Sequence, residues 1–322
     1  MNKSLALVNR RYLRVKVFQA LYALQRSDDA DSQRHERAIF ESINKLYDLY
    51  LYLLKALMDM HDVASEIIEQ NKRKKLPTPE DLNPNMRFVN NRVFQVFKSN
   101  EVYNHLVEKQ KISWTDEHDV LRKIFKSFRE TDMYRLYMAR EDVNFQNDKN
   151  VLIDLFTSQI ALNEVIHNSL EEKDIYWQDD LPMAAITVIK TLQQLPDTTE
   201  PRASILADLY KDKEEDQRFI KELFRKTLQF DKEYEQLIAS KAENWEIERI
   251  AHLDMLLMKM ALTELEHFAT VPVKVTLNEY IELAKAYSTP KSKIFINGVL
   301  DKLVAELKAS GRIQKRGRGL IE

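Results

Sequence analysis

The segment VNRRYLRVKVFQALYALQR, residues 8–26, combines cations with aromatic rings at helical spacing. At about 100° per residue, one helix face carries Leu13 and Val17, and the opposite face carries basic and aromatic side chains: Arg10, Arg11, Arg14, Phe18 and Tyr22. Arginine binds phosphate in a bidentate manner, and aromatic rings stack on unpaired bases. The segment therefore favours contact with single-stranded RNA. The alternative is a solvated charged face with Phe18 and Tyr22 in the core.

Positive charge is concentrated at both ends of the chain. The 322 residues carry a net charge of −2, yet residues 1–27 carry +6 and residues 289–322 carry +5, so residues 28–288 carry −13. Basic ends with an acidic middle are typical of a protein that brings both termini to one polyanion. For the final segment KASGRIQKRGRG taken alone, we favour a disordered tail. The KRKK run at Lys72–Lys75 predicts an exposed helix end, with an auxiliary RNA contact as the alternative.

The composition excludes several classes of chemistry. The chain has no cysteine, which excludes disulfides, thiolate metal sites and cysteine nucleophiles. It contains no phosphate-binding glycine loop, no nucleophile elbow and no zinc-ligand spacing, so we expect no catalytic residues and no cofactor. Charged residues interrupt every apolar run before it could span a membrane, and the start of the chain shows no secretory pattern. We expect a cytoplasmic protein without membrane contact.

The placement of glycine and proline predicts long helices. All four glycines lie within the last 25 positions, and residues 85–181 contain neither glycine nor proline. Apolar residues recur at helical spacing in most windows, and strand-like alternation is missing. The predicted fold is therefore all-α. Aromatic residues at helical spacing in the middle of the chain are expected to belong to the core: Phe88, Phe94, Phe97, Phe125 and Phe128.

The carboxy-terminal third divides into three predicted helices. The first covers roughly residues 246–267, and the second begins with Pro272 and runs to about Tyr287. The third has Thr289 as its N-cap, with Pro290 behind it. Gly298 lies inside the third helix, where glycine costs about 1 kcal/mol relative to alanine, so we expect another backbone to approach it closely.

Two Glu-x-x-His motifs raise the possibility of a di-iron site. They are Glu164–His167 and Glu264–His267, and the i, i+3 spacing places each glutamate and histidine on one helix face. Ferritin-like proteins use such a pair of motifs together with two further glutamates in a helical bundle. Charged residues are dense enough in this chain for such pairs to arise by chance. We therefore expect no metal site.

Several motifs, in order along the chain, resemble those of the bacterial transcription antitermination factor family NusB. They are RRYLRVKVFQALY near the start, and RIAHLDMLLMKMALTELEH, VPVKVTLNEYIELAKAYS and KIFINGVLDKL near the end. Residues 218–241 resemble the family's middle helix pair. The resemblance covers about residues 5–27 and 218–309, and the stretch between is far longer than the family usually carries.

The resemblance implies a fold of small helical bundles that binds the single-stranded boxA element of ribosomal RNA leader transcripts. It implies a partnership with the ribosomal protein NusE and with the antitermination complex of RNA polymerase, and no catalysis. Matching the motifs residue by residue, the family's arginine-rich helix corresponds to Arg10, Arg11 and Arg14, and the tyrosine of QALY is Tyr22. The lysine of ELAK is Lys285. The aromatic residue of the FVNG motif, here FING, is Phe295, with a core role as its alternative.

The chain departs from the family pattern near this last motif. The residue before the aromatic is often basic in the family and is Ile294 here, and an acidic position a few residues earlier is Lys291. We expect Lys291, with Lys293 nearby, to supply a phosphate contact in compensation. For NusE, the resemblance points to Asp254, an acidic position at the partner interface.

The resemblance divides the chain into four predicted regions. Residues 1–33 form the RNA-binding helix, residues 34–215 a helical insertion, residues 216–310 the carboxy-terminal bundle and residues 311–322 a basic flexible tail. The insertion is interpreted either as an enlargement of the scaffold or as a docking surface for a further partner. The main functional alternative is a helical interaction scaffold without boxA affinity. A fused RNA methyltransferase is excluded, since the chain lacks its cysteine and glycine-rich loop.

Overall fold

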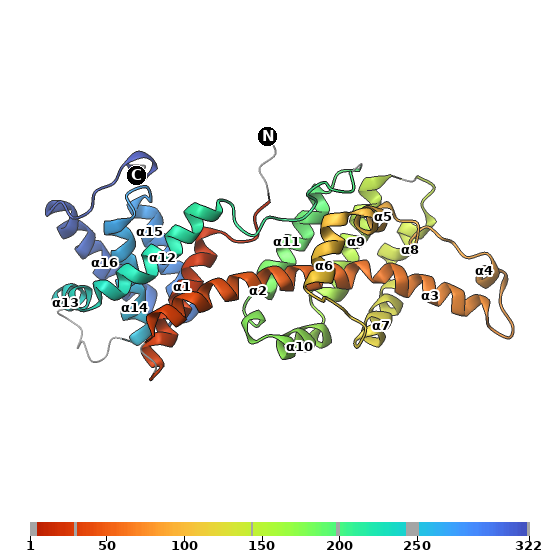
Figure 1. Ribbon diagram of the computed structural model, residues 1–322, viewed down its shortest axis with the longest axis horizontal. Coiled ribbons are helices and arrows are strands. Elements are labelled where there is room, and N and C mark those ends of the chain that lie inside the picture. Colours follow the sequence, from red (N-terminus) through yellow and green to blue (C-terminus); the bar gives the residue numbers. More distant parts are fainter. Residues whose placement is uncertain (1–4, 29–30, 143, 198–199, 243–250, 321–322) are drawn as a thin grey trace. The chain divides into compact units, whose positions relative to one another are not determined.

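The computed structural model describes residues 5–28, 31–142, 144–197, 200–242 and 251–320. These residues form helices and connecting loops without any strand (Figure 1). An isolated backbone bridge joins Ala6 and Asp208. The predicted all-α fold is confirmed. No helix within the described ranges has both the length and the apolar character needed to cross a membrane.

The chain forms two compact units. Unit 1 comprises the residues up to Leu7 and Ser42–Lys211, and unit 2 comprises Val8–Glu41 and Asp212–Glu322. Helix α2 (Ser32–Met58) contributes its first ten residues to unit 2 and the remainder to unit 1. No glycine or proline interrupts its sequence, so nothing ends the helix near the expected boundary at residue 33. The boundary between the two compact units therefore falls within a helix, between Glu41 and Ser42, and the predicted bounds of the insertion stay a prediction.

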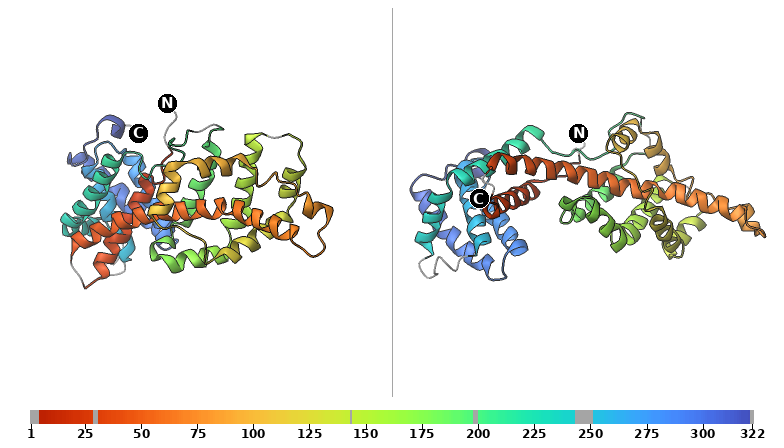
Figure 2. Two further views of the ribbon diagram at one scale, coloured as in Figure 1. Left: turned by 45° about the vertical axis from the view of Figure 1, so that its right-hand side comes forward. Right: turned by 60° about the horizontal axis from the view of Figure 1, so that its bottom comes forward.

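Besides part of α2, the described residues of unit 1 form nine α-helices, one π-helical turn and one 3₁₀ turn around an aromatic core. Phe88, Phe94 and Phe125 lie in edge or tilted ring contacts, and all five phenylalanines predicted to be core are buried, which confirms that prediction. Figure 2 shows α3 leading into the short α4 at one end of this unit. The segments are α3 (Met60–Lys72), α4 (Pro79–Leu82), α5 (Arg92–Ser99), α6 (Glu101–Lys109), α7 (His118–Arg129), α8 (Asp132–Ala139), α9 (Phe145–Leu155) with a π-helical turn (Phe156–Ile160), α10 (Glu164–Lys173), a 3₁₀ turn (Ile175–Trp177) and α11 (Leu181–Gln194).

Unit 2 surrounds one apolar helix, α14 (His252–His267). Eleven consecutive or nearly consecutive residues of α14 are buried, and helices pack against it from several sides. A helix that is apolar all round must be enclosed in this way. The surrounding helices are α1 (Arg10–Arg26), α12 (Lys213–Gln229), α13 (Asp231–Lys241), α15 (Val273–Tyr287) and α16 (Ser292–Ala309).

The predicted helix boundaries in unit 2 hold in part. Pro272 is the N-cap of α15, and that helix ends at Tyr287 as expected. Helix α16 begins at Ser292, later than predicted, with Lys291 as N-cap; the Thr289 hydroxyl instead bonds the Ser292 hydroxyl at 2.8 Å. Helix α14 begins at His252; the preceding predicted residues, up to 250, lie outside the described ranges.

The segment after α16 packs on the end of α14, which differs from the flexible tail that the sequence suggests. Arg312 forms an ion pair with Glu233 at 2.6 Å, and the Arg316 amide donates to the Ala269 carbonyl. The Lys315 ammonium donates to the carbonyl of Phe268 at 3.0 Å. A cation there complements the free carbonyls at a helix C-terminus, so α14 itself fixes this segment.

Gly298 is not approached by another backbone, so that expectation was wrong. A Cβ built on Gly298 has no heavy atom within 4 Å outside the local helix, and the residue is exposed on α16. The close approach occurs at Gly319, where a Cβ would meet the Ala269 carbonyl oxygen at 2.0 Å. Packing therefore requires glycine at 319 and does not require it at 298.

Gly298→Ala should stabilise the protein by about 0.5–1 kcal/mol, because alanine loses less backbone freedom in a helix and meets open space here. Urea denaturation monitored by circular dichroism measures the change. Gly319→Ala serves as the contrast and should destabilise, because its Cβ would collide with the Ala269 carbonyl. A destabilised Gly298→Ala variant would contradict the assignment.

The stability of unit 2 should depend on the ionisation of Lys315, whose pKa burial lowers to about 8. Below pH 8, Lys315 is protonated in both folded and unfolded chains, and its burial opposes folding. Between pH 8 and 10.5, the unfolded chain binds more protons, so stability rises with pH. The difference in unfolding free energy between the parent and Lys315→Met should shift in favour of the parent over that interval. An unchanged difference between about pH 7 and pH 10 would rule this out.

Candidate nucleic-acid interface

Helix α1 lies against α12 and α14 through its apolar face. The Asn9 side chain accepts from the Tyr12 amide and caps the helix start. Phe18 is buried and its ring lies 5.3 Å from that of Tyr287 on α15, so Phe18 is a core residue, as the alternative interpretation held. Tyr22, one turn further on, is 36% exposed, and the guanidinium of Arg26 lies 5.6 Å from its ring. Of these two rings, only that of Tyr22 is accessible to a base.

Arg14 lies in the core of unit 2. It is 3% exposed and donates two hydrogen bonds of 2.7 Å to the carboxylate of Glu264, which is itself fully buried on α14. Thr276 and Tyr280 of α15 donate to the same carboxylate at 3.0 and 3.3 Å. Burial opposes the charged form of Arg14, but the charge and hydrogen bonds of Glu264 outweigh it and raise the Arg14 pKa. Arg14 therefore joins α1, α14 and α15 and is inaccessible to RNA in this conformation.

Arg10 lies at the start of α1, against α12. Its guanidinium is 2.8 Å from Glu215 and 3.0 Å from Asp216, and it covers the ring of Phe219 at 4.4 Å. These acidic residues occupy the first turn of α12, where negative charge is favoured by the helix dipole. Arg10 is one-third exposed, so a phosphate can reach it only in competition with two carboxylates.

Arg11 and Lys285 lie on an exposed face shared by α1 and α15. Arg11 donates to both oxygens of Glu279, at 2.9 and 2.8 Å, and these hydrogen bonds raise the pKa of Arg11 and lower that of Glu279. Lys285 pairs with Glu282, and this bond lowers the pKa of Glu282. Arg11 also feels the charge of Glu282. Two carboxylates therefore alternate with two cations along this face.

The junction of α15 and α16 presents two further cations. Lys291 and Lys293 are exposed, and within the described ranges neither forms an ion pair. Ile294 is 72% exposed beside them, whereas Phe295 is 8% exposed and packs inward. The burial of Phe295 favours the core role that the sequence left as its alternative.

Asp254 lies inside unit 2 and supports this junction. It is 5% exposed and accepts a hydrogen bond from the Ser288 hydroxyl, which in turn bonds Ser292 at the start of α16. Asp254 therefore holds the end of α15 against the start of α16. A role at a partner interface would be indirect, through the position of the two exposed lysines.

Sequence reasoning brought the correct helices together and missed the carboxylates. Arg11, Tyr22 and Lys285 are exposed on α1 and α15, while Arg14 and Phe295 are internal. Glu279 and Glu282 went unnoticed, although the spacing of Glu282 and Lys285 is the one typical of a helical ion pair. The partners of Arg10, Arg11 and Arg14 lie more than 200 residues away, so no local pattern marks them.

The two Glu-x-x-His motifs do not form a metal site in the described structure. Glu264 is saturated by Arg14, Thr276 and Tyr280, and the ring of His267 stacks on Phe230 at 4.9 Å. Burial, with Lys226 and Arg312, lowers the pKa of His267. His167 lies in unit 1, where a ring nitrogen bonds the Ala161 carbonyl. No cluster of three or more histidine or acidic residues suited to a metal ion occurs in the described part of the chain.

Comparison with known proteins identifies the fold family. A NusB family model matches residues 183–305. The NusB transcription antitermination protein of Salinibacter ruber is 50% identical over 103 residues, 32% of this chain and 64% of that protein. That of Symbiobacterium thermophilum is 32% identical over 153 residues, 48% of this chain and 93% of that protein. The chain belongs to the NusB family.

The chain matches some of its NusB relatives over only part of their length. The protein of Chloroherpeton thalassium is 42% identical over 104 residues, 49% of its length, so for two of these three relatives the chain spans less than two thirds of the relative. No solved structure matches the chain. The NusB match begins at residue 183, inside α11 of unit 1.

Arg14→Met should destabilise the protein by about 3–5 kcal/mol, because it leaves the Glu264 carboxylate buried without its counter-ion. Arg14→Met combined with Glu264→Met should recover much of that loss, since the desolvated charge is then removed as well. Urea denaturation of both variants provides the measurement. A single variant as stable as the parent would show that Arg14 is not a core residue.

Proposed function

We propose that this protein is a non-catalytic, RNA-binding antitermination factor. It binds boxA-type single-stranded RNA together with NusE and joins the antitermination complex of RNA polymerase. Its NusB family membership and the names of its relatives as transcription antitermination proteins support this function. The observation that carries the proposal is an exposed group of one aromatic ring and four cations on α1, α15 and the start of α16: Arg11, Tyr22, Lys285, Lys291 and Lys293.

The proposed RNA surface gains affinity in two ways. Lys291 and Lys293 form no ion pair within the described ranges, so a phosphate binds them without breaking a bond inside the protein. Arg11 and Lys285 must first exchange Glu279 and Glu282 for phosphate. Tyr22 offers a ring on which a base can stack. The two unpaired lysines should therefore dominate the electrostatic part of binding.

The alternative function, an interaction scaffold without boxA affinity, also has structural support. Arg10, Arg11 and Arg14 are all paired with carboxylates, and Arg14 and Phe295 are buried. Replacing the three arginines together cannot separate the two functions, because loss of Arg14 would disturb the core. The lysines of α16 allow a cleaner test.

Lys291→Glu combined with Lys293→Glu should weaken binding of a short boxA-type RNA by about tenfold or more and flatten its salt dependence by about 0.7 for each phosphate that the variant no longer neutralises. Fluorescence anisotropy at several salt concentrations measures both, with and without NusE. The matched control is Lys302→Glu with Lys308→Glu, an equal charge change at two exposed positions further along α16. No measurable binding of boxA RNA by the parent would favour the scaffold alternative, and equal losses in the two double variants would show that Lys291 and Lys293 are not the RNA site.

A further inference from the structure

Helix α7 in unit 1 separates into an apolar and a basic face. Its buried residues are Leu121, Ile124, Phe125 and Phe128. Four cations of α7 are not buried: Arg122, Lys123, Lys126 and Arg129. Arg122, Lys126 and Arg129 lie at successive turns on one side of the helix. This face is basic inside a stretch of chain whose overall charge is strongly negative.

The cations of this face have no acidic partners. Within the described ranges, none of the four α7 cations forms an ion pair; Arg122 donates to the neutral Gln70 amide, and Arg129 bonds the Tyr134 hydroxyl. Arg10, Arg11 and Arg14 of α1, by contrast, are bound to carboxylates. A phosphate can therefore bind Lys123 and Lys126 without displacing a partner that the described residues provide, whereas Arg122 and Arg129 would have to exchange or share a neutral one.

Helix α3 brings the KRKK run beside this face. His118 of α7 contacts Glu66 of α3 at 3.1 Å, and four residues later Arg122 contacts Gln70. These two contacts indicate that the helices run in the same direction. Helix α3 ends at Lys72, so the KRKK run begins at the end of the helix that packs beside α7. Helices α3 and α7 pack against each other.

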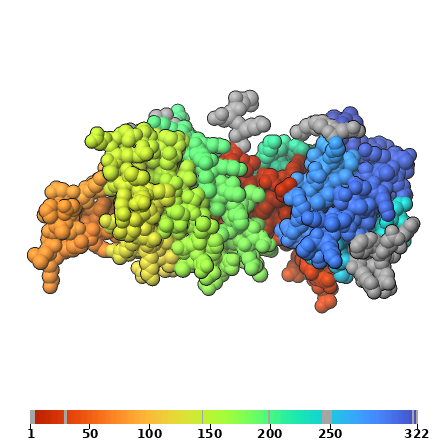
Figure 3. Space-filling model, turned by 180° about the vertical axis from the view of Figure 1, so that it is seen from behind, coloured from red at the N-terminus to blue at the C-terminus, as the bar shows by residue number. Residues whose placement is uncertain are grey.

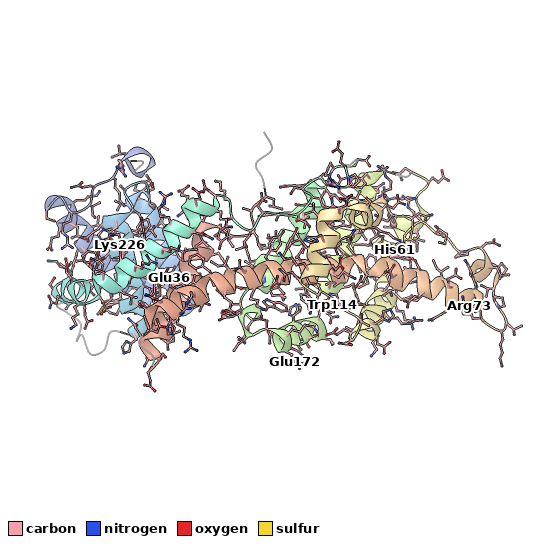
Figure 4. All side chains as sticks on the ribbon, in the orientation of Figure 1. Glu36, His61, Arg73, Trp114, Glu172 and Lys226 are labelled. Atoms are coloured by element: carbon pink, nitrogen blue, oxygen red, sulfur yellow. The ribbon has the colours of Figure 1, made fainter. Side chains whose placement is uncertain are left out.

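The KRKK run adds two more unpaired cations. Lys72 and Lys74 pair with Glu69 and Asp81, whereas Arg73 and Lys75 are exposed and form no ion pair within the described ranges. Figure 4 labels Arg73 at the end of α3, and the space-filling view in Figure 3 shows this orange end of unit 1 at the surface. Residues 70–78 contain four basic residues and no acidic one.

A cavity beside the end of α7 gives this surface an apolar component. Its volume is about 580 Å³, and its lining includes Phe125, Arg129 and Tyr134, together with the carboxylates of Glu80, Asp81 and Glu130. Tyr134 is half-buried there, with an aromatic ring and a neighbouring cation. The apolar part of this lining suits an unstacked base, which a paired duplex does not offer, while its carboxylates leave the phosphates to the exposed lysines of α7.

We infer that the basic face of α7 and the Lys72–Lys75 turn form a second RNA-binding surface, which holds the phosphate backbone of a single strand without reading a defined sequence. The choice of RNA over another polyanion rests on the proposed function. The surface lies wholly in unit 1, so its contribution can be measured separately from that of α16.

The test uses the full chain and a mixed-sequence single-stranded RNA of about 20 nucleotides that lacks boxA. Lys123→Glu with Lys126→Glu should weaken binding about tenfold and reduce the salt slope by about 1.4, which is about 0.7 for each of two phosphates left without a cation. The matched control, Lys98→Glu with Lys109→Glu, makes the same charge change at exposed positions on α5 and α6 and should retain most of the affinity. Arg73→Ala with Lys75→Ala provides an independent variant, should the first fail to fold by circular dichroism.

The outcomes separate this inference from the proposed function. If the α7 variant loses affinity for mixed-sequence RNA while Lys291→Glu with Lys293→Glu leaves boxA binding unchanged, the second surface stands and the boxA proposal fails. If the α7 and Arg73/Lys75 variants bind mixed-sequence RNA with the parent's affinity and salt slope, the inference is wrong. It is equally wrong if these variants lose binding to poly-L-glutamate and keep binding RNA, because the surface then serves an acidic protein.

Discussion

The buried ion pair between Arg14 and Glu264 is the constraint on which unit 2 depends. Two charges removed from water are costly unless both are fully hydrogen-bonded, and here Thr276 and Tyr280 complete the shell of the carboxylate. Because both side chains are enclosed, α1 cannot slide along α14 or rotate without leaving a charge unpaired. The pair thereby fixes which residues of α1 face outward. Arg11 and Tyr22 are exposed because Arg14 is not.

The pairing of the remaining cations divides the basic surfaces into two kinds. Arg10, Arg11 and Lys285 are already bound to carboxylates, so an anionic ligand gains only the difference between two similar contacts. Lys291, Lys293 and the α7 lysines Lys123 and Lys126 are exposed and form no ion pair within the described ranges, so a ligand gains the release of their counter-ions in full. A helix rich in arginine is therefore a weaker indication of an RNA site than its composition suggests.

Periodicity predicted the fold better than it predicted the site. The all-α class and the five core phenylalanines followed from apolar spacing, because local geometry decides which face of a helix packs. The burial of Arg14, Asp254 and Phe295 depends on partners that are distant in sequence or on the packing of a whole unit. Local sequence likewise does not reveal that Gly298 is exposed or that the segment after α16 packs on α14. Motif resemblance placed these residues in the right family, but their exposure required the structure.

Unit 2 consists of two chain segments that are far apart in sequence, and this affects the order in which the units can fold during synthesis. Arg14 is synthesised 250 residues before Glu264, which at about 5–20 residues per second is a delay of roughly 12–50 seconds. Nearly all of unit 1 lies in one continuous stretch, Ser42–Lys211, and leaves the ribosome within that interval. During this interval Arg14 of α1 lacks Glu264, whereas unit 1 can already fold. Unit 1 can therefore fold before unit 2, which is complete only after its second chain segment has been synthesised.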